Sequence, residues 1–241
     1  MATTRYSRIL LKLSGEALAS GEDPFGHDNL TNLSHTLREA VDDGVQIGVV
    51  VGAGNLFRAR SANLGVMNRV TADHVGMMAT MMNASVLRDY LRAEGTRAVI
   101  LSPQAYPPLS RAFSRDIALP LLQDRTILIF GGGTGNPYFT TDSAAALRAL
   151  EIQADVLLKG TQVDGVYDKD PHLHDDACRF DHLTYAEVID RRLRVMDLTA
   201  VALCEENSLP IEVFDISDPA NLLRVIRGQL QGTLVTKESH S

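Results

Sequence analysis

The sequence predicts an α/β fold of three layers (α/β/α), in which helices cover both faces of a mostly parallel central sheet. Short apolar runs rich in β-branched residues alternate with stretches of helical period along the chain. These runs are nearly continuous in apolar character, as expected of strands that are buried on both faces. The chain has 241 residues, 45% of them hydrophobic, which is enough for a sizeable core. We expect a single domain over residues 1–241, with halves at about 1–150 and about 151–241.

The strands are expected where the apolar runs occur, each bounded by turn-forming residues. The six runs are Ile9–Leu13, Gln46–Val51, Ala98–Leu101, Thr126–Phe130, Val156–Lys159 and Ile211–Phe214.

Helices are expected in most of the intervals between these strands. The first has one apolar face, formed by Leu30, Leu33, Leu37 and Val41, and Gly44 is placed to end it. Another is expected over Ser143–Leu150. A long helical stretch begins near Asp73 and carries a methionine stripe, which predicts either core packing or a subunit contact. The stripe consists of Met77, Met78, Met81 and Met82.

Charge and cysteine content exclude several classes of protein. The formal net charge is -7, the sequence pI is near 5.5, and the basic residues are scattered, so general nucleic-acid binding is not expected. Cys178 and Cys204 form no CxxC pair and predict neither a disulfide framework nor a zinc site. No run of eighteen apolar residues and no secretory pattern occurs, so we expect a cytoplasmic protein without membrane association.

Four loops rich in glycine or hydroxyl residues follow expected strands, and the longest of them indicates phosphate binding. Its glycines allow an anion to approach the backbone, and the helix that follows directs its positive end to the same place. Ligands of open α/β sheets bind beyond the carboxyl ends of the strands, so these loops are expected to converge. They are Ser14–Gly15, Gly52–Asn55, Gly131–Asp142 and Gly160–Pro171.

Lys12, Arg58 and Asp73 are the charged residues near these loops with a possible chemical role. Lys12 interrupts an apolar strand, so it either faces water from an edge strand or meets an anion; the adjacent Ser-Gly turn favours the anion. Arg58 either binds a phosphate through bidentate hydrogen bonds or is a solvated surface charge. Asp73 either favours the start of a helix or accepts hydrogen bonds from ligand hydroxyls.

The acidic segment Asp164–Pro171 does not have the spacing of an EF-hand. Tyr167 is available to pack on a nucleotide base and Asp170 to order phosphates or their magnesium, although a solvated turn is the alternative. No GxxxxGK[ST] loop is present, so phosphate binding of the Walker type is disfavoured.

Several segments together resemble the bacterial uridylate (UMP) kinases of the amino-acid-kinase family. The resemblance is collinear from about residue 8 to residue 235, and two stretches are typical of these kinases in particular: NRV-x-x-DH (Asn68–His74) and TGNPYFTTDSAA (Thr134–Ala145). The segments are KLSGEAL (Lys12–Leu18), GAGNLFR (Gly52–Arg58), NRVTADHVGMMAT (Asn68–Thr80), GTGNPYFTTDSAA (Gly133–Ala145), DGVYDKDP (Asp164–Pro171) and VMDLTA (Val195–Ala200).

The resemblance implies transfer of the γ-phosphoryl group of ATP to UMP, with Mg²⁺, in pyrimidine nucleotide biosynthesis. It implies an acceptor-side first half, an ATP-side second half, and catalytic roles for Lys12, Arg58 and Asp142, the last as a polar organiser. The residues implied for ATP are Lys12, Leu13, Ser14, Gly15, Gly54, Arg58, Thr161, Tyr167 and Asp170. The residues implied for UMP are Ala53, Asp73, Thr134, Gly135, Asn136, Pro137, Tyr138, Phe139, Thr140 and Thr141.

The resemblance also implies a homohexamer that UTP inhibits and GTP activates. The implied GTP segment consists of Gly21, Glu22, Asp23, Pro24, Phe25 and Gly26, and it is one residue longer than in some relatives. Ala53 replaces a usual glycine, which is tolerable if its φ is negative and only its backbone is used. Two alternative functions remain: a carbamate or amino-acid kinase of the same fold, and a non-catalytic nucleotide sensor or storage protein.

Overall fold

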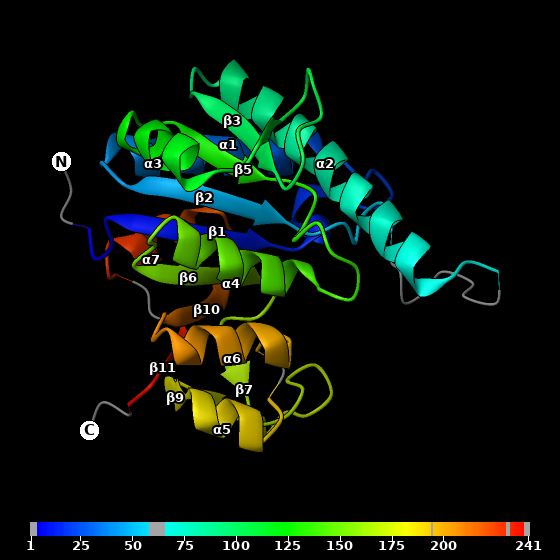
Figure 1. The fold of residues 1–241 in the computed structure, drawn as a ribbon. Coiled ribbons are helices and arrows are strands. Elements are labelled where there is room, and N and C mark those ends of the chain that lie inside the picture. Colours follow the sequence, from blue (N-terminus) through cyan, green and yellow to red (C-terminus); the bar gives the residue numbers. More distant parts are fainter. Residues whose placement is uncertain (1–3, 58–65, 194, 230–231, 239–241) are drawn as a thin grey trace.

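The computed structural model describes residues 4–57, 66–193, 195–229 and 232–238, and these form three layers around a nine-stranded sheet (Figure 1). The strand order is β4-β3-β5-β2-β1-β6-β10-β11-β9, and β7 pairs with β8 in a separate small sheet. The antiparallel pair β10–β11 departs from the otherwise parallel pairing of the central sheet. The predicted fold class is confirmed.

All six predicted strands are present, with ends within two residues of those expected. The additional strands β4, β7, β8, β9 and β11 have two to four residues, too few to show a period in the sequence. The strands are β1 (Arg8–Leu13), β2 (Gln46–Val51), β3 (Ala98–Ser102), β4 (Arg111–Ala112), β5 (Ile127–Phe130), β6 (Val156–Thr161), β7 (Val166–Tyr167), β8 (Arg179–Phe180), β9 (His182–Thr184), β10 (Ile211–Asp215) and β11 (Thr233–Thr236).

The helices divide between the two faces of the sheet. The buried cluster on one face contains residues of α1, α2 and α7, and the cluster on the other contains residues of α3, α4, α5 and α6. Gly44 lies just past α1 with φ of 97°, a left-handed conformation suited to the end of a helix. The helices are η1 (Gly15–Leu18), α1 (His27–Asp42), α2 (Arg69–Ala93), α3 (Arg115–Gln123), α4 (Thr141–Glu151), α5 (Tyr185–Asp190), α6 (Leu198–Glu206) and α7 (Ala220–Ile226).

The central strand β1 directs alternate side chains into the two layers. Ile9, Leu11 and Leu13 join the cluster under α1 and α2, whereas Leu10 joins the cluster under α4. Because side chains alternate along a strand, Lys12 lies on the same face as Leu10, toward α4. β1 has strands on both sides and Lys12 is only 8% exposed, which excludes the interpretation of a water-facing edge lysine.

Two further expectations concern membranes and cysteines. Cys178 is an exposed free thiol and Cys204 a buried one, in agreement with surface and packing roles. Within the described residues no helix has the length and apolar content that a membrane crossing requires. The division of the chain into two functional halves stays a prediction, since the central sheet runs continuously through both.

Candidate functional site

A group of two lysines and one aspartate lies at the carboxyl ends of the central strands. Lys12 of β1 and Lys159 of β6 are register partners, so their side chains emerge side by side on the α4 face. Asp142, in the first turn of α4, lies between them: its Oδ1 is 2.7 Å from Lys12 Nζ and its Oδ2 accepts a hydrogen bond of 3.1 Å from Lys159 Nζ. Lys159 Nζ also donates to the Val195 carbonyl. Two cations held by one anion leave a net positive centre.

The ionisation of this group is set by burial and by mutual attraction. Burial raises the pKa of Asp142, but the two neighbouring ammonium groups together outweigh burial and hold that pKa below its ordinary value. Burial lowers the pKa of Lys159, and the charge of Lys12 lowers it further, while Asp142 opposes both. Asp142 therefore stays ionised at neutral pH and neutralises part of the positive charge.

The glycine-rich loop before α4 has the geometry that the sequence predicts for this type of turn. Gly132, Gly133 and Gly135 have φ of 79°, 58° and 81°, conformations that glycine adopts at low cost. A Cβ on Gly135 would lie 2.7 Å from the Pro103 side chain, so this position also lacks the space for one. At the end of the loop, the Thr140 hydroxyl caps α4 by accepting from the Asp142 amide at 3.0 Å and the Ser143 amide at 3.4 Å.

The loops after β1 and β2 pack directly against each other. A Cβ on Gly15 would lie 2.7 Å from the Gly54 amide nitrogen and closer still to Asn55, which requires glycine there. Asn55 and the buried Asn83 of α2 exchange side-chain hydrogen bonds of 2.8 and 3.1 Å, and Asn83 also donates to the Gly52 carbonyl at 2.7 Å. Both loops are thus fixed at the same edge as Lys12.

A cavity of about 500 Å³ opens between these loops, α2 and the glycine-rich loop. Asp73 lies in its wall, accepts a hydrogen bond of 2.8 Å from the Tyr138 amide, and is paired with Arg69 at 2.8 Å. The side chain that caps α2 is Asn68, so the interpretation of Asp73 as a helix-start residue is wrong. The lining residues are Ala53, Phe57, Arg69, Ala72, Asp73, Gly76, Met77, Thr80, Gly133, Thr134, Phe139, Thr140 and Thr141.

A second cavity, of about 520 Å³, is connected to the lysine pair through its wall residue Val195. Its wall contains Thr161, Tyr167 and Asp170, together with Val195, whose carbonyl binds Lys159. The Thr161 hydroxyl donates to the Val163 carbonyl at 2.7 Å and accepts from the Val163 amide at 3.1 Å. The loop that borders the cavity is therefore an ordered turn.

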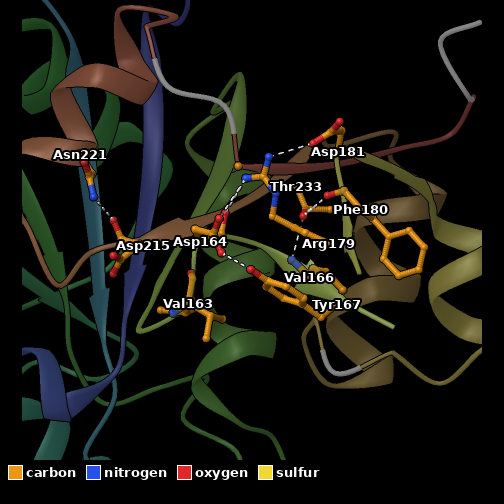
Figure 2. A network of polar contacts seen from close by, with 12 residues as sticks. Val163, Asp164, Val166, Tyr167, Arg179, Phe180, Asp181, Asp215, Asn221 and Thr233 are labelled. Atoms are coloured by element: carbon orange, nitrogen blue, oxygen red, sulfur yellow. Dashed lines mark hydrogen bonds and ion pairs between the residues drawn. The ribbon is translucent and has the colours of Figure 1, made fainter. Parts of the chain in front are cut away.

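The small sheet, whose strand β7 lines this second cavity, is tied to the C-terminal strand (Figure 2). Val166 of β7 donates to the Thr233 hydroxyl at 2.7 Å, and that hydroxyl donates to the Phe180 carbonyl of β8. Asp164 accepts from the Tyr167 hydroxyl at 2.6 Å and pairs with Arg179 at 3.4 Å. The position of Tyr167 in the cavity wall is thus fixed from two sides.

The structure places six of the residues implied for UMP in the wall of the first cavity, three of those implied for ATP in the wall of the second, and Lys12 with Asp142 at the lysine pair. Four residues implied for ATP, namely Leu13, Ser14, Gly15 and Gly54, line neither cavity, and the Leu13 side chain is fully buried in the core. Four UMP residues of the glycine-rich loop, namely Gly135, Asn136, Pro137 and Tyr138, do not line the first cavity, and the Tyr138 side chain is 68% exposed. Ala53 is not among the described non-glycine residues with positive φ, so the backbone conformation accepts its methyl group; contact through the backbone alone stays a prediction. Arg58 lies outside the described residues.

The segment expected to bind GTP forms a tight turn that contacts the loop after β2. The backbones of Ser20 and Asp23 exchange hydrogen bonds of 2.8 and 3.0 Å, and Gly21 has φ of 58°. Asn55 donates to the Pro24 carbonyl at 2.8 Å, which joins this turn to the loop after β2. Nothing in the fold tests GTP binding, which stays a prediction.

Two charged residues of the site were missed by the sequence reasoning. Lys159 was treated only as the end of a strand, although a lysine in an apolar run is the same signal that identified Lys12. Asp197 belongs to the segment VMDLTA that contributes to the resemblance, but it has no role in the sequence analysis; in the structure it accepts hydrogen bonds from Thr140 and Ser143 across the gap between α4 and α6. No local pattern distinguishes Asp197 from an ordinary helix cap.

The sequence profile of the amino acid kinase family matches residues 7–215, nearly the whole extent of the sheet and both cavities. The chain belongs to the amino acid kinase family. Within this family it is similar to uridylate kinases: it is 48% identical over 233 residues to that of Pseudomonas syringae pv. syringae (strain B728a), with 96% of this chain and 94% of the relative covered.

Solved structures of UMP kinases have the same fold as this member of the amino acid kinase family. The UMP kinase of Bacillus anthracis superposes with a TM-score of 0.92 at 33% identity, with 97% of both chains covered. The UMP kinase of Ureaplasma parvum gives 0.91 at 34% identity, with 97% of this chain and all of the other covered. The three-layer architecture and the strand order are thus those of a known nucleotide kinase fold.

Proposed function

We propose that this protein is a UMP kinase, which transfers the γ-phosphoryl group of ATP to UMP and releases UDP and ADP in pyrimidine nucleotide biosynthesis. The observation that carries the proposal is the buried Lys12–Asp142–Lys159 group between two cavities, each of a size that suits a nucleotide. Extensive similarity to uridylate kinases supports UMP as the acceptor.

The two cavities divide the substrates between them. UMP occupies the cavity lined by Asp73 and Thr140, where a carboxylate and several hydroxyls offer partners for ribose, base and phosphate. ATP occupies the cavity lined by Tyr167 and Asp170, with its phosphates directed toward the loops at Gly15 and Gly54. The remaining residues implied by the resemblance keep the roles stated for them, including Arg58 at the phosphates.

The chemical step needs positioning and neutralisation of charge rather than a covalent intermediate. Negative charge on the transferring phosphoryl group is stabilised by the ammonium groups of Lys12 and Lys159, which lie side by side in a largely buried centre. Asp142 holds the two ammonium groups in place and offsets their mutual repulsion. In this mechanism Asp142 organises the site and takes no proton.

We propose Mg²⁺ as the ion that accompanies ATP. Among the described residues no group of three or more His, Cys, Asp or Glu side chains is placed to hold a metal ion. In nucleotide sites Mg²⁺ is commonly bound by phosphates, water and one or two carboxylates, and Asp170, in the wall of the ATP-side cavity, is the carboxylate we favour. When bound, the ion neutralises charge on the β- and γ-phosphates.

The assay for this function is ADP release from ATP and Mg²⁺, with UMP, CMP, dCMP, carbamate and acidic amino acids offered separately. We expect turnover to be confined to UMP. Turnover with carbamate or an amino acid instead would assign the acceptor cavity to another kinase of the fold. Tight ATP binding without any turnover would favour the nucleotide sensor or storage protein.

Regulation and assembly follow from the same resemblance. We propose a cytoplasmic homohexamer with UTP as inhibitor and GTP as activator, the latter through the turn at Gly21–Gly26. A hexamer needs apolar surface for contacts, and Met78 and Met82 of α2 are 66% and 54% exposed one helical turn apart, whereas Met81 is buried. The methionine stripe therefore supplies both core packing and a surface for subunit contact.

Charged residues at this surface should break the assembly. We expect Met78→Glu combined with Met82→Glu to lower the mass of the particle in sedimentation equilibrium, because burying two carboxylates in an apolar contact is costly. Asn32→Glu, at an exposed position on α1, is the matched control and should leave the mass unchanged. A double variant with the mass of the wild type would remove this face of α2 from the interface.

A further inference from the structure

The segment Val195–Asp197 lies against the site and contacts both sides of it. The Val195 carbonyl accepts from Lys159 Nζ, and Val195 lines the ATP-side cavity. Two residues later, the Asp197 carboxylate accepts from the hydroxyl of Thr140, which lines the acceptor-side cavity. A stretch of three residues thus joins the walls of the two cavities next to Asp142.

We propose that Asp197 is a positioning residue for phosphoryl transfer, which acts through Thr140 to fix the backbone that carries Asp142. The inference rests on the proposed function of the site. Asp197 lines neither cavity, so its effect on the reaction is indirect.

The Thr140 hydroxyl explains how this influence is transmitted. A hydroxyl has one hydrogen to donate and two lone pairs that accept. Because the hydrogen of Thr140 is donated to Asp197, the lone pairs are turned toward the amides of Asp142 and Ser143, from which the hydroxyl accepts. Without an acceptor at position 197 the hydroxyl can rotate, and the first turn of α4 loses the contact that fixes it.

Asp197 has more contacts than a helix cap requires. As the N-cap of α6, Asp197 accepts one hydrogen bond of 2.9 Å from the Ala200 amide, and this role uses only one carboxylate oxygen. Both oxygens also lie 3.2 Å from the Ser143 hydroxyl, and the second accepts from Thr140. The N-termini of α4 and α6 therefore meet at one carboxylate, whose negative charge suits the positive ends of both helices.

Electrostatics adds a second connection to the site. The charge of Asp197 favours the protonated form of Lys159, although burial has the larger effect and lowers the pKa of that lysine overall. Asp197 could influence kcat through its charge on Lys159 or through its hydrogen bond with Thr140. A double-mutant cycle with a Thr140 variant distinguishes the two effects.

The test uses Asp197→Asn and Asp197→Ser, which retain an oxygen to cap α6 but do not provide the second acceptor for Thr140. We expect each to lower kcat for UMP phosphorylation roughly ten-fold, with KM for ATP within about two-fold of the wild type. The matched control is Ser114→Ala, which removes the cap of α3 and should leave kcat unchanged. Wild-type kcat in both Asp197 variants would overturn the proposal.

The double-mutant cycle also requires Thr140→Val, alone and combined with Asp197→Asn. If Asp197 acts through the Thr140 hydroxyl, adding Asp197→Asn to Thr140→Val should change kcat by less than about two-fold. A full additional ten-fold loss would show that Asp197 acts independently, through its charge on Lys159, and would overturn the proposal.

Hydrogen–deuterium exchange gives a readout that does not depend on activity. Peptides that contain the amides of Asp142 and Ser143 should exchange about ten-fold faster in both Asp197 variants than in the wild type or in Ser114→Ala. Unchanged exchange would overturn the proposal even if kcat fell. A wild-type protein that does not phosphorylate UMP would refute the proposed function, while the exchange rates would still decide whether Asp197 fixes the first turn of α4.

Discussion

Replacing Lys12 by alanine should lower kcat by about 100-fold or more and leave the fold intact. In the proposed mechanism this ammonium group is one of two that stabilise the transferring phosphoryl group, and a single preorganised donor at developing charge is commonly worth a few kcal/mol. The fold should persist because the other side chains of β1 remain in the two cores, and Asp142 keeps Lys159 as its partner. Steady-state kinetics with UMP and ATP, together with circular dichroism, provide the measurement.

Lys237→Ala is the matched control for this variant, because Lys237 is exposed and lies far along the chain from the site. It should have the kcat of the wild type. Near-normal turnover in Lys12→Ala would remove Lys12 from the mechanism and leave Lys159 as the only candidate cation among the described residues of the centre.

Replacing Asp142 by asparagine should have an effect of at least similar size on kcat and should also destabilise the protein. The amide cannot neutralise either lysine, so two largely buried ammonium groups would face each other without the carboxylate that lies between them. Removing one partner of a buried ion pair costs about 3–5 kcal/mol in other proteins, and partial exposure of this group places the expected loss near the lower end. Urea unfolding at pH 7 measures the loss, and full activity in the variant would contradict the role of Asp142.

Acid should reproduce part of this loss in the wild type. The folded-state pKa of Asp142 lies below its ordinary value of 3.8, so the group contributes stability that is fully present above that value and is lost as pH falls through the folded-state pKa. The free energy of unfolding should therefore fall more steeply below about pH 4 in the wild type than in Asp142→Asn. Parallel slopes in the two proteins would show that Asp142 is not preferentially ionised in the folded state.

The fold was predictable because its strands carry a strong local signal. β2 and β6 are apolar over most of their length, as expected of parallel strands that are buried on both faces. β7, β8 and β9 were not predictable, since they have two or three residues and form through contacts with distant segments such as Thr233. Pairing between segments far apart in sequence leaves no local pattern.

The site was predictable to the extent that it is built from loops with unusual composition. Glycines and threonines at the end of β5 indicate an anion site, and the cavity walls contain several of them. The pairing of Lys12 with Lys159 depends on the register between β1 and β6, which no local sequence window contains. The role of Asp197 depends in the same way on how α4 and α6 pack, so sequence alone gave one lysine of the pair and missed the carboxylate that joins the helices.

The strand order has a consequence for how the site forms during synthesis on the ribosome. β1 to β5 make one continuous half of the sheet, with β1 at its border, and β6 is translated later (Figure 1). Until β6 docks, β1 is an edge strand of this half, and the place beside Lys12 that Lys159 takes is open. α4 precedes β6 in the chain, so Asp142 is available before the second lysine arrives. A nascent chain can thus bury the two lysines together without ever enclosing an ammonium group that lacks its counter-ion.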